Sequence, residues 1–178
     1  MEFNRRQILQ FSAATAVTSG LTACAGDDPQ ATIDTSLPTS EFGAQSTAEE
    51  VTAGMNLEGL KVLVTGCNSG LGFETMRVLA LRGAHVIGTG RTLAKAEIAC
   101  ASVEGTTTPL ALELSDYQSA VDCAASVEAL NLVPDVLVCN AGINTFGDLE
   151  LVGGIEKMFV VNFLGHFVLV NRLLAPMQ

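Results

Sequence analysis

A glycine-rich run between a strand-like and a helix-like segment constrains this chain more than any other feature. The run reads Thr65-Gly66-Cys67-Asn68-Ser69-Gly70-Leu71-Gly72, directly follows the strand-like segment 61–64 and directly precedes the helix-like segment 73–82. Glycines allow a sharp turn and a close approach of backbone to ligand, and the first N–H groups of a helix have no partner within it. Strand, glycine turn and helix N-terminus in this order therefore predict a cradle for a phosphate or pyrophosphate group.

Apolar runs and helical patterns alternate along the rest of the chain, which is typical of βαβ units. The expected strands are 61–65, 85–89, 108–112 and 136–139, and the expected helices are 71–82, 93–102, 116–130 and 155–174. Ser115 and Gln118 predict a capping box for the third helix, and the last helix, apolar nearly all round, is expected to be buried. These elements predict an α/β fold: the N-terminal part of a Rossmann-type doubly wound parallel sheet, about four strands in the order 3-2-1-4.

Charge and cysteine spacing exclude two classes of partner. The net charge is −10, and Arg5-Arg6 is the only run of basic residues, so nucleic acid is not an expected partner. Four cysteines in the expected folded part show no C-x-x-C pairing and no histidine at metal spacing, so we predict small buried or loop residues rather than zinc ligands. They are Cys67, Cys100, Cys123 and Cys139.

The N-terminus is typical of an export signal. Asn4-Arg5-Arg6-Gln7-Ile8-Leu9 resembles a twin-arginine motif, and the apolar stretch 8–17 after it is too short and polar to span a bilayer. Leu21-Thr22-Ala23-Cys24 resembles a lipobox, in which Cys24 would carry a lipid anchor. We therefore expect a signal at 1–24, a flexible polar linker at 25–56, a folded domain at 57–178, and an exported, periplasmic or membrane-anchored protein. The alternative is a frayed amphipathic helix with an incidental cysteine on a cytoplasmic protein.

Four motifs in one order carry a resemblance to a known family. They are Val64-Thr65-Gly66-Cys67-Asn68-Ser69-Gly70-Leu71-Gly72, Asn140-Ala141-Gly142, the helical run 161–167 with Asn162, and the lead-in 49–54. Over about residues 46–178 the chain resembles the short-chain dehydrogenase/reductase family, and within it the branch of retinol dehydrogenases and WW-domain oxidoreductases.

The resemblance implies a set of site residues. Asn162 matches the asparagine of the family's catalytic tetrad, which helps to place a water in the proton relay, whereas His166 is expected to be a packed helix residue and His85 to be solvated. The residues expected to bind the dinucleotide are Gly66, Asn68, Ser69, Gly70, Leu71, Gly72, Arg91, Glu113, Leu114, Asn140, Ala141 and Gly142.

The end of the second expected strand predicts which dinucleotide is bound. NAD-binding Rossmann domains carry an acid about 20 residues past the glycines, but this chain reads Ile87-Gly88-Thr89-Gly90-Arg91 there. Arg91 offers a fork for a 2′-phosphate, which favours NADP(H) over NAD(H). The alternative is an ordinary solvated arginine.

The family's chemistry also uses a serine and a Tyr-x-x-x-Lys motif that this sequence does not show. The only tyrosine is Tyr117, and no lysine follows it at the required spacing. We therefore expect the cofactor half of an oxidoreductase that is truncated before those residues and transfers hydride between a nicotinamide and a small, lipophilic alcohol or carbonyl compound. A non-catalytic dinucleotide-binding module or an inactive truncated product is the alternative, and a homo-oligomer stays open for a full-length chain.

Overall fold

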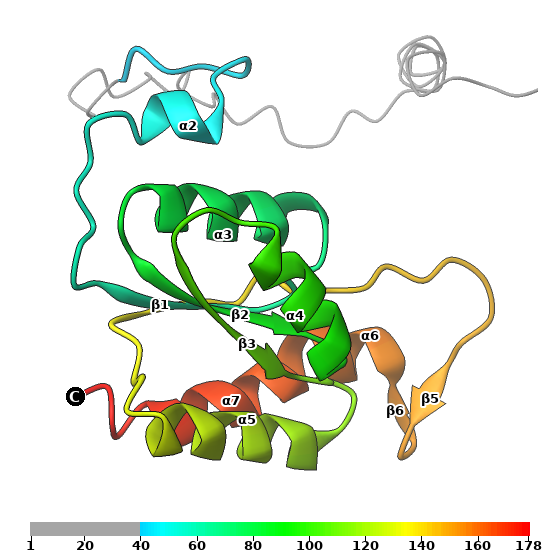
Figure 1. Cartoon of the computed structure of the whole chain (residues 1–178). Coiled ribbons are helices and arrows are strands. Elements are labelled where there is room, and N and C mark those ends of the chain that lie inside the picture. The colour runs from blue at the N-terminus through cyan, green and yellow to red at the C-terminus, as the bar shows by residue number, and fades with distance from the viewer. Residues whose placement is uncertain (1–39) are drawn as a thin grey trace, which may run out of the picture. The chain divides into compact units, whose positions relative to one another are not determined.

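Four parallel strands form the centre of the structure, a computed structural model that describes residues 40–178 (Figure 1). They are β1 (Lys61–Val64), β2 (His85–Gly90), β3 (Thr106–Ala111) and β4 (Val136–Val138), in the order β3-β2-β1-β4. The predicted parallel sheet and its strand order are confirmed. The predicted signal with Cys24 and the first part of the predicted linker lie outside the described residues.

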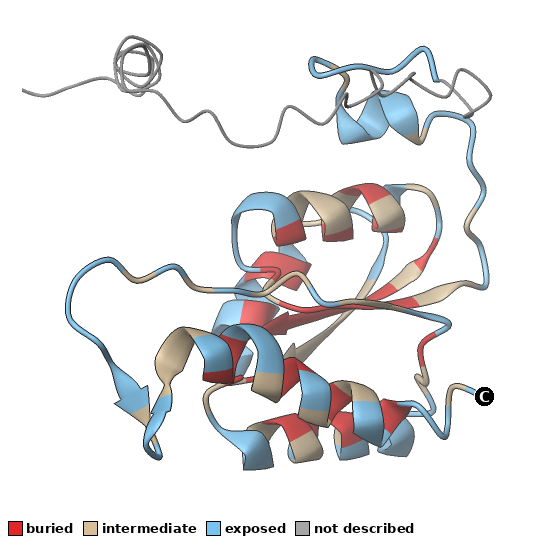
Figure 2. Ribbon diagram, turned by 180° about the vertical axis from the view of Figure 1, so that it is seen from behind, coloured by how far each residue is buried: buried red, intermediate tan, exposed pale blue. Residues whose placement is uncertain are grey.

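Helices cover both faces of this sheet (Figure 1). On one face lie α3 (Gly70–Leu81) and α4 (Leu93–Ala101), and on the other lie α5 (Tyr117–Ala129) and α7 (Gly165–Leu173). Because side chains alternate along a strand, Val62 and Val64 of β1 belong to the first core and Leu63 belongs to the second. The buried residues in Figure 2 accordingly lie on β1 and β2 and on the inward sides of the helices. Coverage of both faces explains why the strands read as apolar runs.

The N-terminus of α5 differs from the prediction. Its N-cap is Asp116, whose carboxylate accepts a hydrogen bond from the Gln118 N–H at 2.9 Å. Ser115 lies before the cap and donates its hydroxyl to Glu113 Oε1 at 2.8 Å. The predicted capping box at Ser115 is wrong because the adjacent aspartate, an equally good cap, begins the helix one residue later.

The segment predicted as one buried helix from residue 155 is wrong at its start. It opens with a hairpin of β5 (Leu151–Val152) and β6 (Ile155–Glu156), whose turn residues Gly153 and Gly154 both adopt positive φ. Helix α6 (Lys157–Phe159) follows, then a π-helical turn η1 (Val160–Leu164), then α7. These two glycines favour a left-handed turn and close the hairpin just before residue 155, so residues 155–156 form a strand and the helix begins at Lys157.

This helical segment is also less buried than predicted. Val160, Leu169 and Leu173 are buried, but Phe159, Phe163 and Phe167 are each about half exposed and stack along the outer side. Within the part of the chain that the structure describes, no helix combines the length and the apolar character that a membrane crossing requires.

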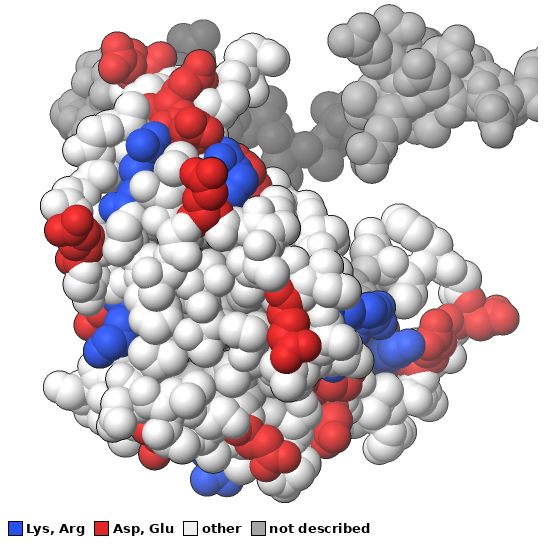
Figure 3. All heavy atoms as spheres, in the orientation of Figure 1, with Lys and Arg blue, Asp and Glu red and all other residues white. Residues whose placement is uncertain are grey.

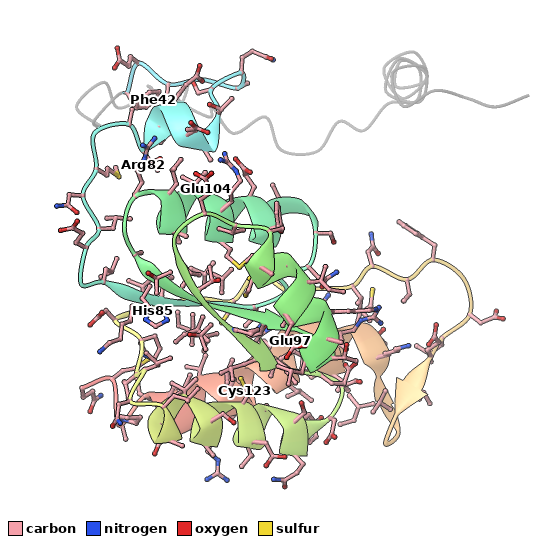
Figure 4. The ribbon with its side chains drawn as sticks, viewed as in Figure 1. Phe42, Arg82, His85, Glu97, Glu104 and Cys123 are labelled. Carbon is pink, nitrogen blue, oxygen red and sulfur yellow. The ribbon has the colours of Figure 1, made fainter. Side chains whose placement is uncertain are left out.

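A short helix lies within the segment predicted as linker. Helix α2 (Ala48–Val51) has a capping box formed by Thr47 and Glu50, and its Glu49 pairs with Arg77 of α3 at 3.0 Å. Arg82, which ends α3 (Figure 4), donates to Thr52 Oγ1 at 3.1 Å. These contacts connect the segment before residue 57 to α3. Acidic and basic side chains lie interspersed on the face shown in Figure 3.

Candidate functional site

A cavity of about 730 Å³ opens where the strands end. Its walls come from the segments that follow β1, β2, β3 and β4, and the chain order of the strands reverses between β1 and β4. Open parallel sheets bind their ligands at such a reversal. All the predicted dinucleotide residues except Gly70 line this cavity, and the predicted catalytic Asn162 does not. The lining residues are Gly66, Asn68, Ser69, Leu71, Gly72, Thr89, Gly90, Arg91, Leu112, Glu113, Leu114, Ser115, Asn140, Ala141, Gly142, Ile143, Asn144, Thr145, Lys157 and Val161.

The glycine loop forms the tightest wall of the cavity. Gly66 has φ +73°, a left-handed conformation that favours glycine. Gly72 has no room for a side chain, since a Cβ atom there would collide with the carbonyl oxygen of Gly66 and with Nδ2 of Asn140. The side chain of Ser69, the N-cap of α3, makes no capping hydrogen bond. The loop therefore turns closely onto the helix, and its side chains leave the helix N-terminus open to an anion.

The segment after β4 is bonded to this loop. Asn140 Nδ2 donates to the Thr65 carbonyl oxygen at 2.8 Å, and the Ala141 N–H donates to Thr65 Oγ1 at 2.9 Å. These bonds bring together two motifs that lie more than 70 residues apart in the chain. They hold the loop and the end of β4 as two sides of one cavity.

The side chain of Asn162 is hydrogen-bonded to the backbone of the segment that follows β4. Its Oδ1 accepts from the Ile143 N–H at 2.8 Å, and its Nδ2 donates to the Ile143 carbonyl oxygen at 2.9 Å. Asn162 lies in the π-helical turn, where the Gly165 N–H donates to the Val160 carbonyl oxygen. π-Helical turns inside helices are frequent at functional sites. The amide thus positions the residues after Gly142 by both of its hydrogen-bonding ends.

Two charged residues flank the far end of the cavity. Arg91 is exposed just past β2 and lines the cavity. The carboxylate of Glu113 accepts from the N–H and the hydroxyl of Ser115, at 3.1 and 2.8 Å. Leu114 is buried beside it. Glu113 therefore lines the cavity with a carboxylate whose position is fixed by its own loop.

Sequence reasoning missed a lysine and misplaced one of the two histidines. Lys157 begins α6 and lines the cavity, and its ammonium group pairs with Glu150 at 2.7 Å. His85 is half-buried and bonded to Thr108 Oγ1 at 2.8 Å rather than solvated. His166 is packed, as predicted, but it also lies 2.9 Å from Thr65 Oγ1 in the glycine run. The sequence carried only two signals for these partners. Thr108 belongs to the strand that follows β2 in the chain, and residues 162 and 166 are spaced by about one helical turn.

The thiol in the glycine loop is inert. Burial raises the pKa of Cys67 to about 12, so its sulfur stays protonated and packs as a small apolar group. Within the described range, His, Cys, Asp and Glu side chains form no cluster that could hold a metal ion.

Stability is expected to fall as the pH drops below about 6.5, and His166 is the cause. Burial lowers the pKa of His166 below its usual value of 6.5, so between those two pKa values the unfolded chain binds more protons than the folded chain. Unfolding free energy then rises with pH through that window, by at most about 1.4 kcal/mol per pH unit for one proton. Urea melts from pH 5.5 to 7.5 would measure this slope. His166→Gln is expected to flatten it, and an unchanged slope in that variant would assign the effect to other groups.

Comparison with known proteins agrees with this geometry. A family model described as short chain dehydrogenase matches residues 60–178. Human WW domain-containing oxidoreductase is 37% identical over 137 residues, covering 74% of this chain and 33% of the relative. Human retinol dehydrogenase 13 is 34% identical over 127 residues, covering 68% of this chain and 38% of the relative. A solved metagenomic short-chain oxidoreductase in complex with NADP has a TM-score of 0.60 and 28% identity, covering 67% of this chain and 57% of that chain.

The aligned regions therefore cover most of this chain but only part of each curated relative. The chain spans roughly a third of the length of these two curated relatives. The family model alone covers well over half of the chain. The ordered motifs, the parallel sheet and these matches together show that the chain belongs to the short-chain dehydrogenase/reductase family, in the branch of the retinol dehydrogenases and WW domain-containing oxidoreductases.

Proposed function

We propose that the cavity binds NADP(H) and that the chain carries the cofactor-binding part of an NADP(H)-dependent oxidoreductase. The observation that carries the proposal is the absence of space at Gly72, where only a glycine lets the loop close onto the helix N-terminus beside Asn140. A pyrophosphate needs this kind of close backbone approach and the positive end of a helix. The metagenomic short-chain oxidoreductase solved in complex with NADP supports the same assignment.

Each predicted site residue has a proposed role, and all of them except Gly70 and Asn162 line the cavity. The three loop glycines and the α3 N-terminus would hold the pyrophosphate, with Asn68, Ser69 and Leu71 along its sides. Glu113 and Leu114 would border the adenine, and the small residues Asn140, Ala141 and Gly142 would let the cofactor approach the end of β4. Asn162 would help to place a water for proton transfer. The lining residues are those of the cavity described above.

The cofactor, when bound, supplies the hydride. The chain's own residues would bind and orient it, and the reaction class would be hydride exchange with an alcohol or carbonyl carbon. We propose a small, lipophilic substrate on the basis of the retinol dehydrogenase named among the relatives.

Arg91 is expected to decide between the two dinucleotides. Arg91→Ala should weaken NADPH binding about tenfold or more, because hydrogen bonds to charged groups are worth about 1.5–3 kcal/mol. NADH lacks the 2′-phosphate, so its affinity should change less than twofold. Isothermal titration of wild type and variant with both cofactors gives the four dissociation constants.

Lys95→Ala is the matched control, since Lys95 is an exposed cation on α4 that does not line the cavity. It should leave both affinities unchanged. Equal losses of NADPH and NADH affinity in Arg91→Ala, or a loss in Lys95→Ala of the same size, would show that Arg91 is not the phosphate-selecting group.

We also propose that residues 1–24 direct export and that Cys24 carries a lipid. The support is the sequence alone, Arg5-Arg6 followed by an apolar stretch and a lipobox-like end. A fusion of residues 1–35 to a reporter, fractionated by compartment, should place the reporter outside the cytoplasm. Cys24→Ser should release it from the membrane, and a reporter found only in the cytoplasm would defeat the export proposal.

A further inference from the structure

The hydroxyl group of Thr65 lies at the junction of three segments. Its Oγ1 is 2.9 Å from His166 Nε2, 2.9 Å from the Ala141 N atom and 3.4 Å from the Val138 carbonyl oxygen. Thr65 is fully buried and His166 is 6% exposed. The strand that leads into the glycine loop, the end of β4 and α7 therefore meet through one hydroxyl.

The partners on either side of His166 determine where its proton lies. Nδ1 is 3.3 Å from the Asn162 carbonyl oxygen, which can only accept, so Nδ1 carries the hydrogen in the neutral ring. Nε2 is then an acceptor. The single hydroxyl hydrogen of Thr65 points to Nε2 at 2.9 Å rather than to the Val138 carbonyl oxygen at 3.4 Å, which already accepts from the Thr65 N–H. A lone pair of the same hydroxyl faces the Ala141 N–H. The reverse tautomer would set the Nδ1 lone pair against the carbonyl oxygen of Asn162.

We propose that His166 is a positioning residue for the dinucleotide site. It fixes the direction of the Thr65 hydroxyl, and through it the spacing between the glycine loop and the segment Asn140-Ala141-Gly142. The same ring ties both to the backbone of Asn162, so the two cofactor-facing walls and the π-helical turn are set as one unit. The effect on cofactor affinity rests on the proposed NADP(H) function, whereas the ring orientation does not.

The chain contains a matched control pair. His85 Nε2 lies 2.8 Å from Thr108 Oγ1 between β2 and β3, and neither residue lines the cavity (Figure 4 labels His85). It is a second histidine–threonine hydrogen bond, partly buried and formed between two strands of the sheet. Removing it reports the general effect of losing such a bond without touching the site.

The ring orientation is tested on the wild-type chain by ¹⁵N NMR of the imidazole groups at pH 7.5. The chain has only two histidines, so the imidazole signals that remain in His85→Gln belong to His166 and those that disappear belong to His85. The His166 ring is expected as the Nδ1–H tautomer with an unprotonated, hydrogen-bonded Nε2. A protonated Nε2, or a mixture of tautomers, would overturn the proposal.

The positioning effect is tested by NADPH affinity in a double-mutant cycle. His166→Asn keeps a donor near Nδ1 but cannot reach Thr65, and Thr65→Val removes the hydroxyl at constant shape. Each should weaken NADPH binding about five- to tenfold, and the double variant should be no weaker than the worse single one. His166→Gln, which places an amide near Nε2, should recover most of the loss. His85→Asn and Thr108→Val should leave the affinity unchanged.

The outcomes separate the two claims. The positioning role would be overturned if the losses of NADPH affinity in Thr65→Val and His166→Asn multiplied in the double variant. Equal losses of affinity in the control variants His85→Asn and Thr108→Val would overturn it as well. Failure of wild type to bind NADPH, with the Nδ1–H tautomer present, would overturn the proposed function and leave the link between His166 and Thr65 standing. If His166→Asn does not fold, the wild-type NMR spectrum and a pair of Thr65 variants test the proposal instead. Thr65→Val should weaken NADPH binding, and Thr65→Ser, which keeps the hydroxyl, should bind like wild type.

Discussion

Gly72→Ala is expected to abolish measurable NADPH binding and to lower the free energy of unfolding by about 2–3 kcal/mol. The new Cβ atom would meet the Gly66 carbonyl oxygen and Asn140 Nδ2, and the first of these is backbone that cannot move aside freely. Alanine normally stabilises a helix relative to glycine by about 1 kcal/mol, so the observed sign would itself report the clash. Relief of the collision requires the loop to move away from α3, which opens the phosphate cradle.

Calorimetric titration with NADPH and urea denaturation measure the two effects. Gly43→Ala is the control, because Gly43 has open space around its Cβ position and no positive φ. That variant should change stability by less than about 0.5 kcal/mol. A Gly72→Ala chain that binds NADPH like wild type would contradict the close-packed loop.

Gly165→Ala is expected to destabilise the fold by about 1–3 kcal/mol. Gly165 begins α7, and a Cβ atom there would collide with the Leu114 carbonyl oxygen and lie 2.8 Å from Leu114 Cβ. The helix would have to shift away from the loop after β3, and Leu114 and the cavity wall beside it would shift too. NADPH affinity should fall along with stability, since α7 also carries His166.

The matched control for this second variant lies on the same helix. Asn171 is exposed on α7, so Asn171→Ala should leave the unfolding free energy within about 0.5 kcal/mol of wild type. Chemical denaturation of both variants and of wild type measures the two changes in unfolding free energy. Equal, small effects of the two substitutions would show that α7 does not need its close approach to Leu114.

Local patterns were enough to predict the sheet and most of the cavity. The strand, glycine turn and helix at 61–82 form from neighbouring residues, and the parallel order of the strands follows from repeated βαβ units. Arg91 and the segment Asn140-Ala141-Gly142 could be assigned to the cavity because each directly follows a strand. The carboxyl ends of parallel strands meet at one edge of the sheet, so position in the chain predicted position in space.

Contacts between distant residues could not be predicted in this way. His166 and Thr65 lie 101 positions apart, and no period or motif signals that their side chains are hydrogen-bonded. The helical spacing of Asn162 and His166 suggested a shared face, but not that Asn162 turns its amide to Ile143 rather than to the cavity. The hairpin before α6 was missed for another reason: Gly153-Gly154 was a local signal, outweighed by the apolar run that follows it.

The central claim, that a dinucleotide pyrophosphate lies on the glycine loop, is tested most directly by a backbone amide NMR titration with NADP⁺. The largest shifts are expected at the loop amides between Gly66 and Gly72 and at Ala141 and Gly142, with saturation at one equivalent. Amides of α2, which lies outside the cavity lining, should stay unchanged. No saturable shifts, or shifts concentrated away from the glycine loop, would contradict the claim.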